Sequence, residues 1–233
     1  MQPKPDERLL SAVPYLKQGG RIADVGTDHA YLPIYLVKSG ISSFAVASDL
    51  REGPIERARR NVDMAGLSKK IELVLCDGLS KIEPFAPDDI LIFGMGGELI
   101  VSILEAALWV KNEQIGLVLQ PMSHPEILRS YLLENGFAIL GESLSFADRI
   151  YQTIYARYGA KKDPRPYTEA ELLIGRHNLA SDSPLLRPLL LREIDILGRV
   201  IAGKRRSADP DTREEETLLR QLNEELEKHH ENT

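Results

Sequence analysis

Residues 24–33, with the sequence Asp-Val-Gly-Thr-Asp-His-Ala-Tyr-Leu-Pro, constrain the fold of this chain more than any other segment. They follow a short apolar run at 21–23 that predicts a buried strand, and they lead into residues 32–37, which predict the start of a helix. A glycine at such a turn lets the backbone approach a ligand closely, and the helix N-terminus favours polar or anionic groups. The segment therefore predicts a ligand-binding loop in an α/β protein.

A carboxylate follows the next predicted strand at a spacing that suits nucleotide binding. Residues 44–48 predict that strand, and Asp49 and Leu50 come directly after it. In nucleotide-binding α/β folds, an acidic residue about twenty positions beyond the glycine turn hydrogen-bonds a pair of ribose hydroxyls. The two features together predict a cofactor that contains adenosine.

Strand-like and helix-like segments alternate from residue 21 to about residue 119, which predicts a parallel sheet covered by helices on both faces. The further strands expected are 71–75, 90–93 and 115–119, and the further helices are 52–65, 97–110 and 125–135.

The end of this region breaks the alternation. Residues 137–146 and 150–158 are both strand-like and only three residues separate them, so they can form only an antiparallel hairpin. Five parallel strands followed by a hairpin predict the Rossmann-like seven-stranded sheet of class I methyltransferases, in which the last strand is antiparallel. This layout favours S-adenosylmethionine over NAD.

The flanking segments predict a helix before the sheet and a second domain after it. Residues 6–17 form an amphipathic pattern that suits a helix packed over the cofactor end or the edge of the sheet. Prolines at 164 and 166 interrupt any helix in the linker that follows the hairpin. We expect a cofactor-binding methyltransferase domain at 1–159 and a helical domain at 160–233.

Two helical patterns make up most of the second domain, which we expect to be coiled-coil-like. Apolar residues recur at three- and four-residue spacing over 185–201 and again over 218–226. The run Asp209-Pro210-Asp211 would turn the chain between them.

Composition excludes several classes of protein. No stretch approaches the roughly 20 apolar residues of a membrane helix, so we expect a cytoplasmic protein that does not engage membranes. The single cysteine, Cys76, excludes a multi-cysteine zinc site, the histidines show no metal-ligand pairing, and no metal is expected. No feature fixes an oligomeric state, and a monomer is the working expectation.

The net charge of −6 argues mildly against a dedicated nucleic-acid binder, but it conceals a basic block. Residues 161–206 hold ten Lys and Arg against six Asp and Glu, whereas residues 207–233 hold three against nine. The block ends in Lys204-Arg205-Arg206. It is either a set of solvated helix faces or a surface for nucleic acid.

Polar residues or glycines stand at the ends of the other predicted strands of the sheet. Asp77 and Gly78 follow the third strand, where an acid in methyltransferase-like sheets faces the exocyclic amine of the adenine. The fourth strand ends in Gly94-Met95-Gly96-Gly97, where three glycines would let a flat base or a sulfonium approach the backbone. The fifth strand ends at Gln120, at the same edge of the sheet.

Residues 24–33, residues 94–97 and Gln120-Pro121 together resemble the bacterial tRNA (adenine-22 N1)-methyltransferase family. The resemblance covers the sheet domain and extends more loosely to the helical domain. It implies that the first domain binds S-adenosylmethionine and that the methyl group goes to N1 of an adenine in the D-loop region of tRNA. Asp49 is a departure, because glutamate is common at that position.

The resemblance and the strand ends together give the candidate site residues. The expected cofactor-binding residues are Asp24, Gly26, Thr27, Asp28, His29, Asp49, Leu50, Cys76, Asp77, Gly78, Gly94 and Met95. The expected substrate-binding residues are Tyr31, Gly96, Gln120, Lys204, Arg205 and Arg206.

Asp28 is the candidate catalytic residue. Adenine N1 has an in-plane lone pair, so the main task of the enzyme is to align it with the methyl donor. Methylation leaves the base cationic, and a carboxylate near the N6 amine would orient the base and stabilise that charge. From the residues alone Asp28 could equally cap the following helix, and the family resemblance favours the catalytic role.

Three other functions are compatible with parts of the pattern. A small-molecule methyltransferase would carry the same cofactor fold, with a closed substrate pocket. A non-catalytic module would bind a nucleotide and use its helical domain for protein partners. A dehydrogenase is disfavoured by the terminal hairpin and by the lack of a full Gly-x-Gly-x-x-Gly.

Overall fold

The structure is a computed structural model that describes residues 5–206 and 211–229. Contacts between Cα atoms divide the chain into two compact units, one that runs to Pro164 and one that begins at Arg165.

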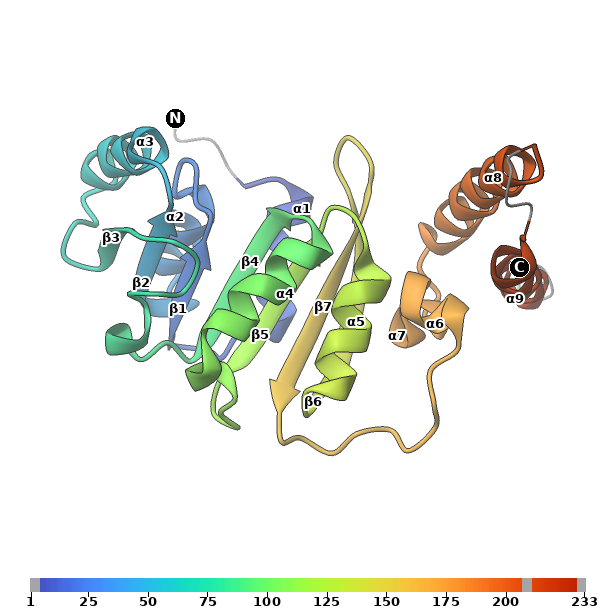
Figure 1. The fold of residues 1–233 in the computed structure, drawn as a ribbon. Helices are drawn as coiled ribbons and strands as arrows, with labels where there is room; N and C mark the ends of the chain where they lie inside the picture. Colours follow the sequence, from blue (N-terminus) through green and yellow to red (C-terminus); the bar gives the residue numbers. More distant parts are fainter. Residues whose placement is uncertain (1–4, 207–210, 230–233) are drawn as a thin grey trace. The chain divides into compact units, whose positions relative to one another are not determined.

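A seven-stranded sheet forms the centre of the first unit (Figure 1). Its strands are β1 (Gly20–Val25), β2 (Ser42–Asp49), β3 (Ile71–Leu75), β4 (Asp89–Met95), β5 (Gly116–Pro121), β6 (Phe137–Phe146) and β7 (Ile150–Tyr158). They lie in the order β3-β2-β1-β4-β5-β7-β6, and β7 is antiparallel to both of its neighbours. The predicted sheet and its terminal hairpin are thereby confirmed.

Helices cover both faces of this sheet. They are α1 (Glu7–Leu10), α2 (Tyr31–Lys38), α3 (Glu52–Met64), α4 (Gly97–Ala106) and α5 (Pro125–Glu134). In β4, Leu91 and Phe93 belong to the core cluster that also holds residues of α2 and α3. The alternate residues of β4 point to the opposite face, which α4 and α5 cover (Figure 1).

The first helix is much shorter than the sequence predicts. The expected helix at 6–17 is wrong beyond Leu10, because α1 ends there and a separate 3₁₀ turn covers Val13–Tyr15. Pro14 lacks an amide hydrogen and fits the start of a new turn rather than the interior of a helix. Leu9, Val13 and Leu16 still pack against the core cluster of the sheet.

An ion pair buried inside the first unit fixes the terminal hairpin to α5. Arg129 Nε donates to Glu142 Oε1 across 2.7 Å, and both side chains are fully buried. Arg129 Nη2 also donates to Gln152 Oε1 of β7, at 2.7 Å. Because a buried charge is costly unless it is paired and hydrogen-bonded, this network holds α5, β6 and β7 in one arrangement.

The second unit is helical. It contains α6 (Glu169–Ile174), α7 (Arg176–Leu179), α8 (Leu186–Lys204) and α9 (Arg213–Lys228). The long pair α8 and α9 packs together with crossing axes (Figure 1), whereas the turn predicted at 209–211 falls largely outside the described residues.

The short helices α6 and α7 were not predicted. Thr168 and Glu171 form a capping box at the start of α6, and Gly175, with a φ of 99°, separates the two helices. Thr-x-x-Glu was the sequence signal for this start, but four- and six-residue helices are too short to show a clear apolar period.

Among the residues that the structure describes, no helix is long and apolar enough to cross a membrane.

Candidate active site

Backbone hydrogen bonds bring the carboxyl ends of three strands to one edge of the sheet. The amides of Gly26 and Thr27, just past β1, both donate to the carbonyl of Ser48 in β2, at 2.8 Å. The amide of Cys76, just past β3, donates to the carbonyl of Asp49 at 3.1 Å. The loops that follow β1, β2 and β3 therefore start from fixed positions side by side.

A first cavity at this edge lies over the ends of β1, β2 and β3. It has a volume of about 240 Å³. Asp49 lines it with a carboxylate whose Oδ1 accepts the Arg51 amide at 2.8 Å. Its residues are Val25, Gly26, Ser48, Asp49, Leu50, Arg51, Cys76, Asp77, Gly78, Met95, Leu99 and Ile103.

The chemistry of this first cavity suits an adenosine. One carboxylate stands at the end of β2 and a second, that of Asp77, follows β3, while Leu50, Leu99 and Ile103 supply apolar walls. A sugar diol needs the acceptors, and a flat base needs apolar surfaces. Cys76 is buried, and its thiol lies 3.5 Å from the Gly78 carbonyl, as expected of a packed side chain.

The second cavity lies over the glycine loop and has a volume of about 320 Å³. It shares Val25 and Gly26 with the first cavity and reaches the end of β4 at Gly94. Its residues are Arg8, Leu9, Asp24, Val25, Gly26, Thr27, Asp28, His29, Ala30, Tyr31, Leu32, Phe93 and Gly94. The two cavities form adjoining halves of one site.

Gly26 stands where the two cavities adjoin. Its φ is +82°, and a Cβ atom at this position would overlap Cε of Met95. The glycine therefore gives the loop a conformation and a close approach that other residues would disturb. A cradle of this kind fits the narrow middle of a ligand that spans both cavities.

Asp24 is the buried acid of the second cavity, with an exposed fraction of 8%. Burial raises the pKa of its carboxyl from 3.8 to about 6, while a hydrogen bond from Thr27 and the nearby charge of Arg8 act in the opposite direction. A carboxyl held this way gains from any cation placed beside it, such as an ammonium group.

Asp28, in contrast, is 58% exposed at the rim of the second cavity. Its Oδ1 pairs with Arg57 of α3, whose Nε lies at 3.0 Å, and its Oδ2 lies 3.3 Å from Nε2 of His29. The helix-capping alternative is wrong, because the N-cap of α2 is Ala30 and the Ala30 amide donates to Thr27 Oγ1. His29 in turn stacks on Tyr31, with ring centroids 4.9 Å apart.

The glycines at the end of β4 have different structural roles. Gly94 takes a φ of +76° and lines the second cavity, as expected of a ligand contact. Gly97 instead packs against the loop before α5: its amide donates to the Ser123 carbonyl at 2.8 Å, and a Cβ atom would overlap the His124 carbonyl. Gly96 lies next to the same loop, outside the described cavity linings.

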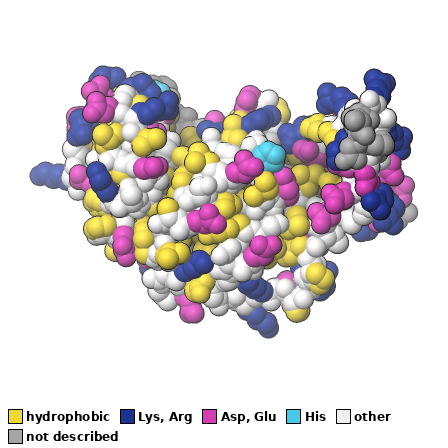
Figure 2. Space-filling model, in the orientation of Figure 1, with side chains coloured by type: hydrophobic (Ala, Val, Ile, Leu, Met, Phe, Trp, Pro, Cys, Tyr) yellow, Lys and Arg dark blue, Asp and Glu magenta, His cyan; other side chains and the backbone are white. Residues whose placement is uncertain are grey.

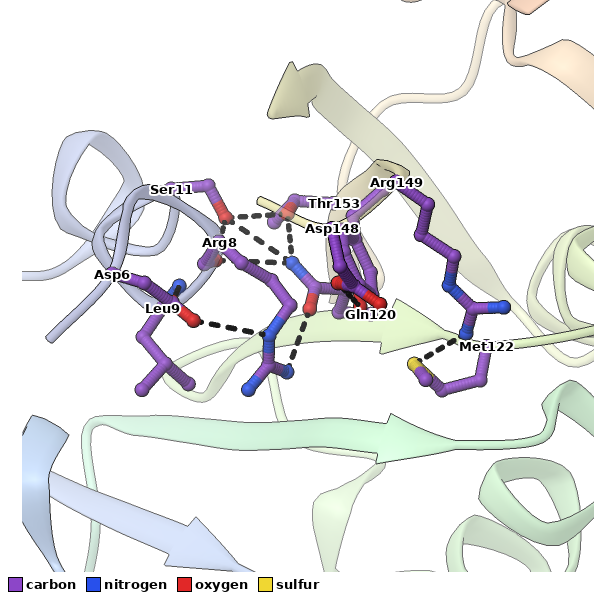
Figure 3. A network of polar contacts seen from close by, with 10 residues as sticks. Asp6, Arg8, Leu9, Ser11, Gln120, Met122, Asp148, Arg149 and Thr153 are labelled. Atoms are coloured by element: carbon purple, nitrogen blue, oxygen red, sulfur yellow. Dashed lines mark hydrogen bonds and ion pairs between the residues drawn. The ribbon is translucent and has the colours of Figure 1, made fainter. Parts of the chain in front are cut away.

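Gln120 is fully buried, and its side-chain amide forms hydrogen bonds with other groups of the protein (Figure 3). Its Nε2 donates to the Arg8 carbonyl at 3.1 Å and to Thr153 Oγ1 at 3.0 Å, and its Oε1 accepts from Arg8 Nη1 at 3.2 Å. Gln120 therefore joins α1 to β5 and β7, and direct contact with substrate stays a prediction.

Lys204 and Arg205 form ion pairs within the helical unit. Lys204 pairs with Glu215, and Arg205 Nη2 lies 2.8 Å from Glu216 Oε1. Figure 2 shows Asp and Glu side chains beside Lys and Arg side chains over this unit. The basic block is thus partly compensated by the acidic residues that follow it, and Arg206 is exposed.

Several site residues escaped sequence analysis. Leu99 and Ile103 of α4 line the first cavity, and Arg8 and Leu9 of α1 line the second. The pattern at 6–17 placed α1 over the cofactor end or the sheet edge, but nothing in it distinguished Arg8 from a solvated side chain.

A seven-stranded sheet with an antiparallel terminal hairpin, a glycine loop after β1 and a carboxylate after β2 define a class I methyltransferase that uses S-adenosylmethionine. Comparison of the sequence with known protein families agrees with this: the family model described as "Methyltransferase domain" matches residues 6–154. The chain also belongs to the bacterial tRNA (adenine(22)-N1)-methyltransferase family.

Known proteins support this placement. The tRNA (adenine(22)-N(1))-methyltransferase of Bacillus subtilis is 36% identical over 157 residues, which cover 67% of this chain and 66% of that enzyme. The crystal structure of the B. subtilis m1A22 tRNA methyltransferase TrmK is similar with a TM-score of 0.77 and 28% identity, and 98% of each chain is covered. Streptococcus pneumoniae Sp1610 in complex with S-adenosyl-L-methionine is similar with a TM-score of 0.83 and 30% identity, covering 95% of this chain and 99% of that one.

The raised pKa of Asp24 predicts a measurable dependence of stability on pH. Between pH 3.8 and about 6 the folded state holds a proton that the unfolded state has lost, so this residue lowers the free energy of unfolding as pH rises. Asp24→Asn removes the effect. The stability of the variant relative to wild type should therefore rise by roughly 2 kcal/mol between pH 4 and pH 7.

Urea denaturation at a series of pH values measures this difference directly. All other titrating groups are common to both proteins, so their contributions cancel. Parallel stability curves for the two proteins across that range would contradict the assignment.

Proposed function

We propose that this protein transfers a methyl group from S-adenosylmethionine to N1 of adenine 22 in tRNA. The observation that carries the proposal is the second cavity, which joins the glycine loop to an exposed, ion-paired carboxylate, Asp28. A site with an exposed rim suits a substrate far larger than the cavity itself. The B. subtilis relatives named for this activity support the choice of nucleoside.

S-adenosylmethionine supplies an electrophilic methyl group carried on a sulfonium. The residues of the first cavity would hold its adenosine: Asp49 would accept from the ribose hydroxyls, Asp77 would face the adenine amine, and Leu50 would pack on the ring. Cys76 and Gly78 would complete that wall, while the remainder of the cofactor would lie among Gly26, Thr27, His29, Gly94 and Met95.

The acceptor adenine needs orientation more than it needs a base. Its N1 lone pair lies in the ring plane and is available at neutral pH, so no proton has to leave first. The methylated ring then carries a positive charge that extends to the exocyclic amine. A carboxylate beside that amine holds the ring in place and stabilises the charge as it develops.

We assign this role to Asp28. The Arg57 side chain of α3 binds one of its oxygens and fixes its direction at the cavity rim. His29 and Tyr31, stacked beside it, offer flat surfaces for the base. The carboxylate orients the amine through a hydrogen bond and can accept its proton afterwards.

A base inside a folded tRNA is stacked, so the target adenine has to leave its stack to enter the cavity. We assign cofactor binding and methyl transfer to residues 1–159 and contacts with the tRNA backbone to the helical residues 160–233. Lys204, Arg205 and Arg206 would supply part of the charge that the phosphates require.

Labelled S-adenosylmethionine and unmodified tRNA test the function. Digestion of the product and mass spectrometry should find N1-methyladenosine at position 22, and a transcript with guanine at that position should remain unlabelled. Label in a small metabolite, or at another nucleoside, would contradict the proposal.

Asp28→Asn in the same assay tests the catalytic assignment. It keeps the size of the side chain but removes the charge, so the single-turnover rate should fall roughly 10- to 100-fold while the affinity for S-adenosylhomocysteine changes much less. Asp63→Asn, which alters a carboxylate near the end of α3, is the matched control. Equal rates for Asp28→Asn and wild type would remove Asp28 from the chemistry.

Charge reversal at Lys204, Arg205 and Arg206 tests the tRNA surface. The triple glutamate variant should bind tRNA at least about tenfold more weakly and show a smaller slope of log affinity against log salt. A variant with glutamate at Lys38, Lys69 and Lys70, which lie at the end of α2 and just before β3 in the sheet unit, has the same charge change. Circular dichroism checks that the helical unit stays folded, and equal affinities of the two variants would refute the assignment.

A further inference from the structure

Arg57 of α3 holds Asp28 at the rim of the second cavity. Its Nε and its Nη2 both donate to Oδ1 of Asp28, with Nε at 3.0 Å. The side chains are 40% exposed for Arg57 and 58% exposed for Asp28. The pair therefore meets solvent at the mouth of the cavity, where a substrate approaches.

This contact uses only one edge of the Arg57 guanidinium. A guanidinium has N–H donors on two edges, and Asp28 accepts from the edge formed by Nε and Nη2. Within the described part of the chain, Nη1 donates to no protein group. It lies near the exposed residue Gly53, where a Cβ atom would be 3.6 Å away, so the lack of a side chain there leaves the second edge accessible.

The same face of α3 borders the loop that carries Asp28. Asn61, one turn beyond Arg57, donates to the His29 carbonyl at 2.9 Å, so this face of the helix lies against the loop. Arg60 is three residues beyond Arg57, next to it on the helix surface, and is exposed. The helix thus presents guanidinium groups beside the cavity rim.

A tRNA brings negative charge to this rim. The target adenine enters the cavity as part of its nucleotide, so the two phosphates that flank it stay outside, close to the rim. The carboxylate of Asp28 repels these phosphates unless a cation stands between them. The second edge of Arg57 suits a phosphate, because it can donate two parallel hydrogen bonds to phosphate oxygens.

We propose that Arg57 binds a phosphate that flanks the target adenine, through the edge formed by Nη1 and Nη2, while Nε and the other hydrogen of Nη2 stay bonded to Asp28. One side chain then links the backbone of the extruded nucleotide to the carboxylate that orients its base. The inference rests on the proposed function, because it takes tRNA as the substrate, and it adds a contact in the sheet unit to those assigned to the helical unit.

A neutral backbone linkage is the probe for this inference. The tRNA is joined from synthetic pieces with a methylphosphonate on the 5′ or the 3′ side of adenosine 22, which removes one phosphate charge and keeps the base. At subsaturating protein, the wild-type single-turnover rate should fall roughly 10- to 100-fold for one of the two positions, as expected for a lost hydrogen bond between charged groups.

Variants of Arg57 show whether this side chain senses the phosphate. Arg57→Gln should be slower on the all-phosphate tRNA, and the same methylphosphonate should change its rate by less than about threefold. Arg57→Lys should keep part of the wild-type response, because an ammonium still attracts the phosphate but cannot donate from two edges.

Arg59 provides the matched control. It is exposed on the same helix, but a step of two residues turns its side chain away from the face that carries Arg57. Arg59→Gln removes the same charge and should keep the full wild-type response to the methylphosphonate. Melting curves of the tRNAs check that the neutral linkage leaves them folded.

Two results would overturn the inference. The wild-type rate could be unchanged by a methylphosphonate at either position, which would mean that the charge of neither flanking phosphate is bound. Arg57→Gln could instead keep the full wild-type response, which would limit Arg57 to orienting Asp28. If the wild-type protein failed to methylate the all-phosphate tRNA at adenine 22, the proposed function itself would fail, and the two failures are therefore distinguishable.

Discussion

Two hydrogen bonds from the glycine loop to the neighbouring strand organise the whole site. The amides of Gly26 and Thr27 share the Ser48 carbonyl, and this contact joins the end of β1 to the end of β2. Asp49 follows Ser48 directly, and Asp24 lies two residues before Gly26, so the same contact fixes the positions of a carboxylate in each cavity. Without it the two cavities would lose their shared wall at Gly26.

The two acids of the second cavity differ in ways that match different tasks. Asp24 is buried and its pKa is raised, so it gains most from a cation that displaces water around it. Asp28 is exposed and already paired with Arg57, which suits a residue that meets a large substrate at the rim. Burial thus distinguishes Asp24, which we expect to face the cofactor, from Asp28, which we propose faces the acceptor base.

Local patterns predicted the sheet because its strands are short, apolar and separated by clear helical segments. The three-residue gap between 146 and 150 settled the direction of the hairpin, and Asp49 was found from its spacing to Gly26. The apolar period continues past Leu10, but α1 ends there and Pro14 lies in a separate 3₁₀ turn, so the period alone predicted a wrong helix end.

What the sequence could not predict depends on contacts between distant segments. Arg8 and Gln120 are 112 positions apart, and only the folded chain brings them together. Gly97 looked like part of a ligand site, but its lack of a side chain serves packing against His124.

The adjoining cavities accept an adenosine carrying an amino-acid group rather than a dinucleotide. Titration calorimetry of the full chain with S-adenosylhomocysteine and with NADH compares the two directly. S-adenosylhomocysteine should bind saturably, and NADH should give no detectable heat. Tight binding of NADH with no response to S-adenosylhomocysteine would contradict it.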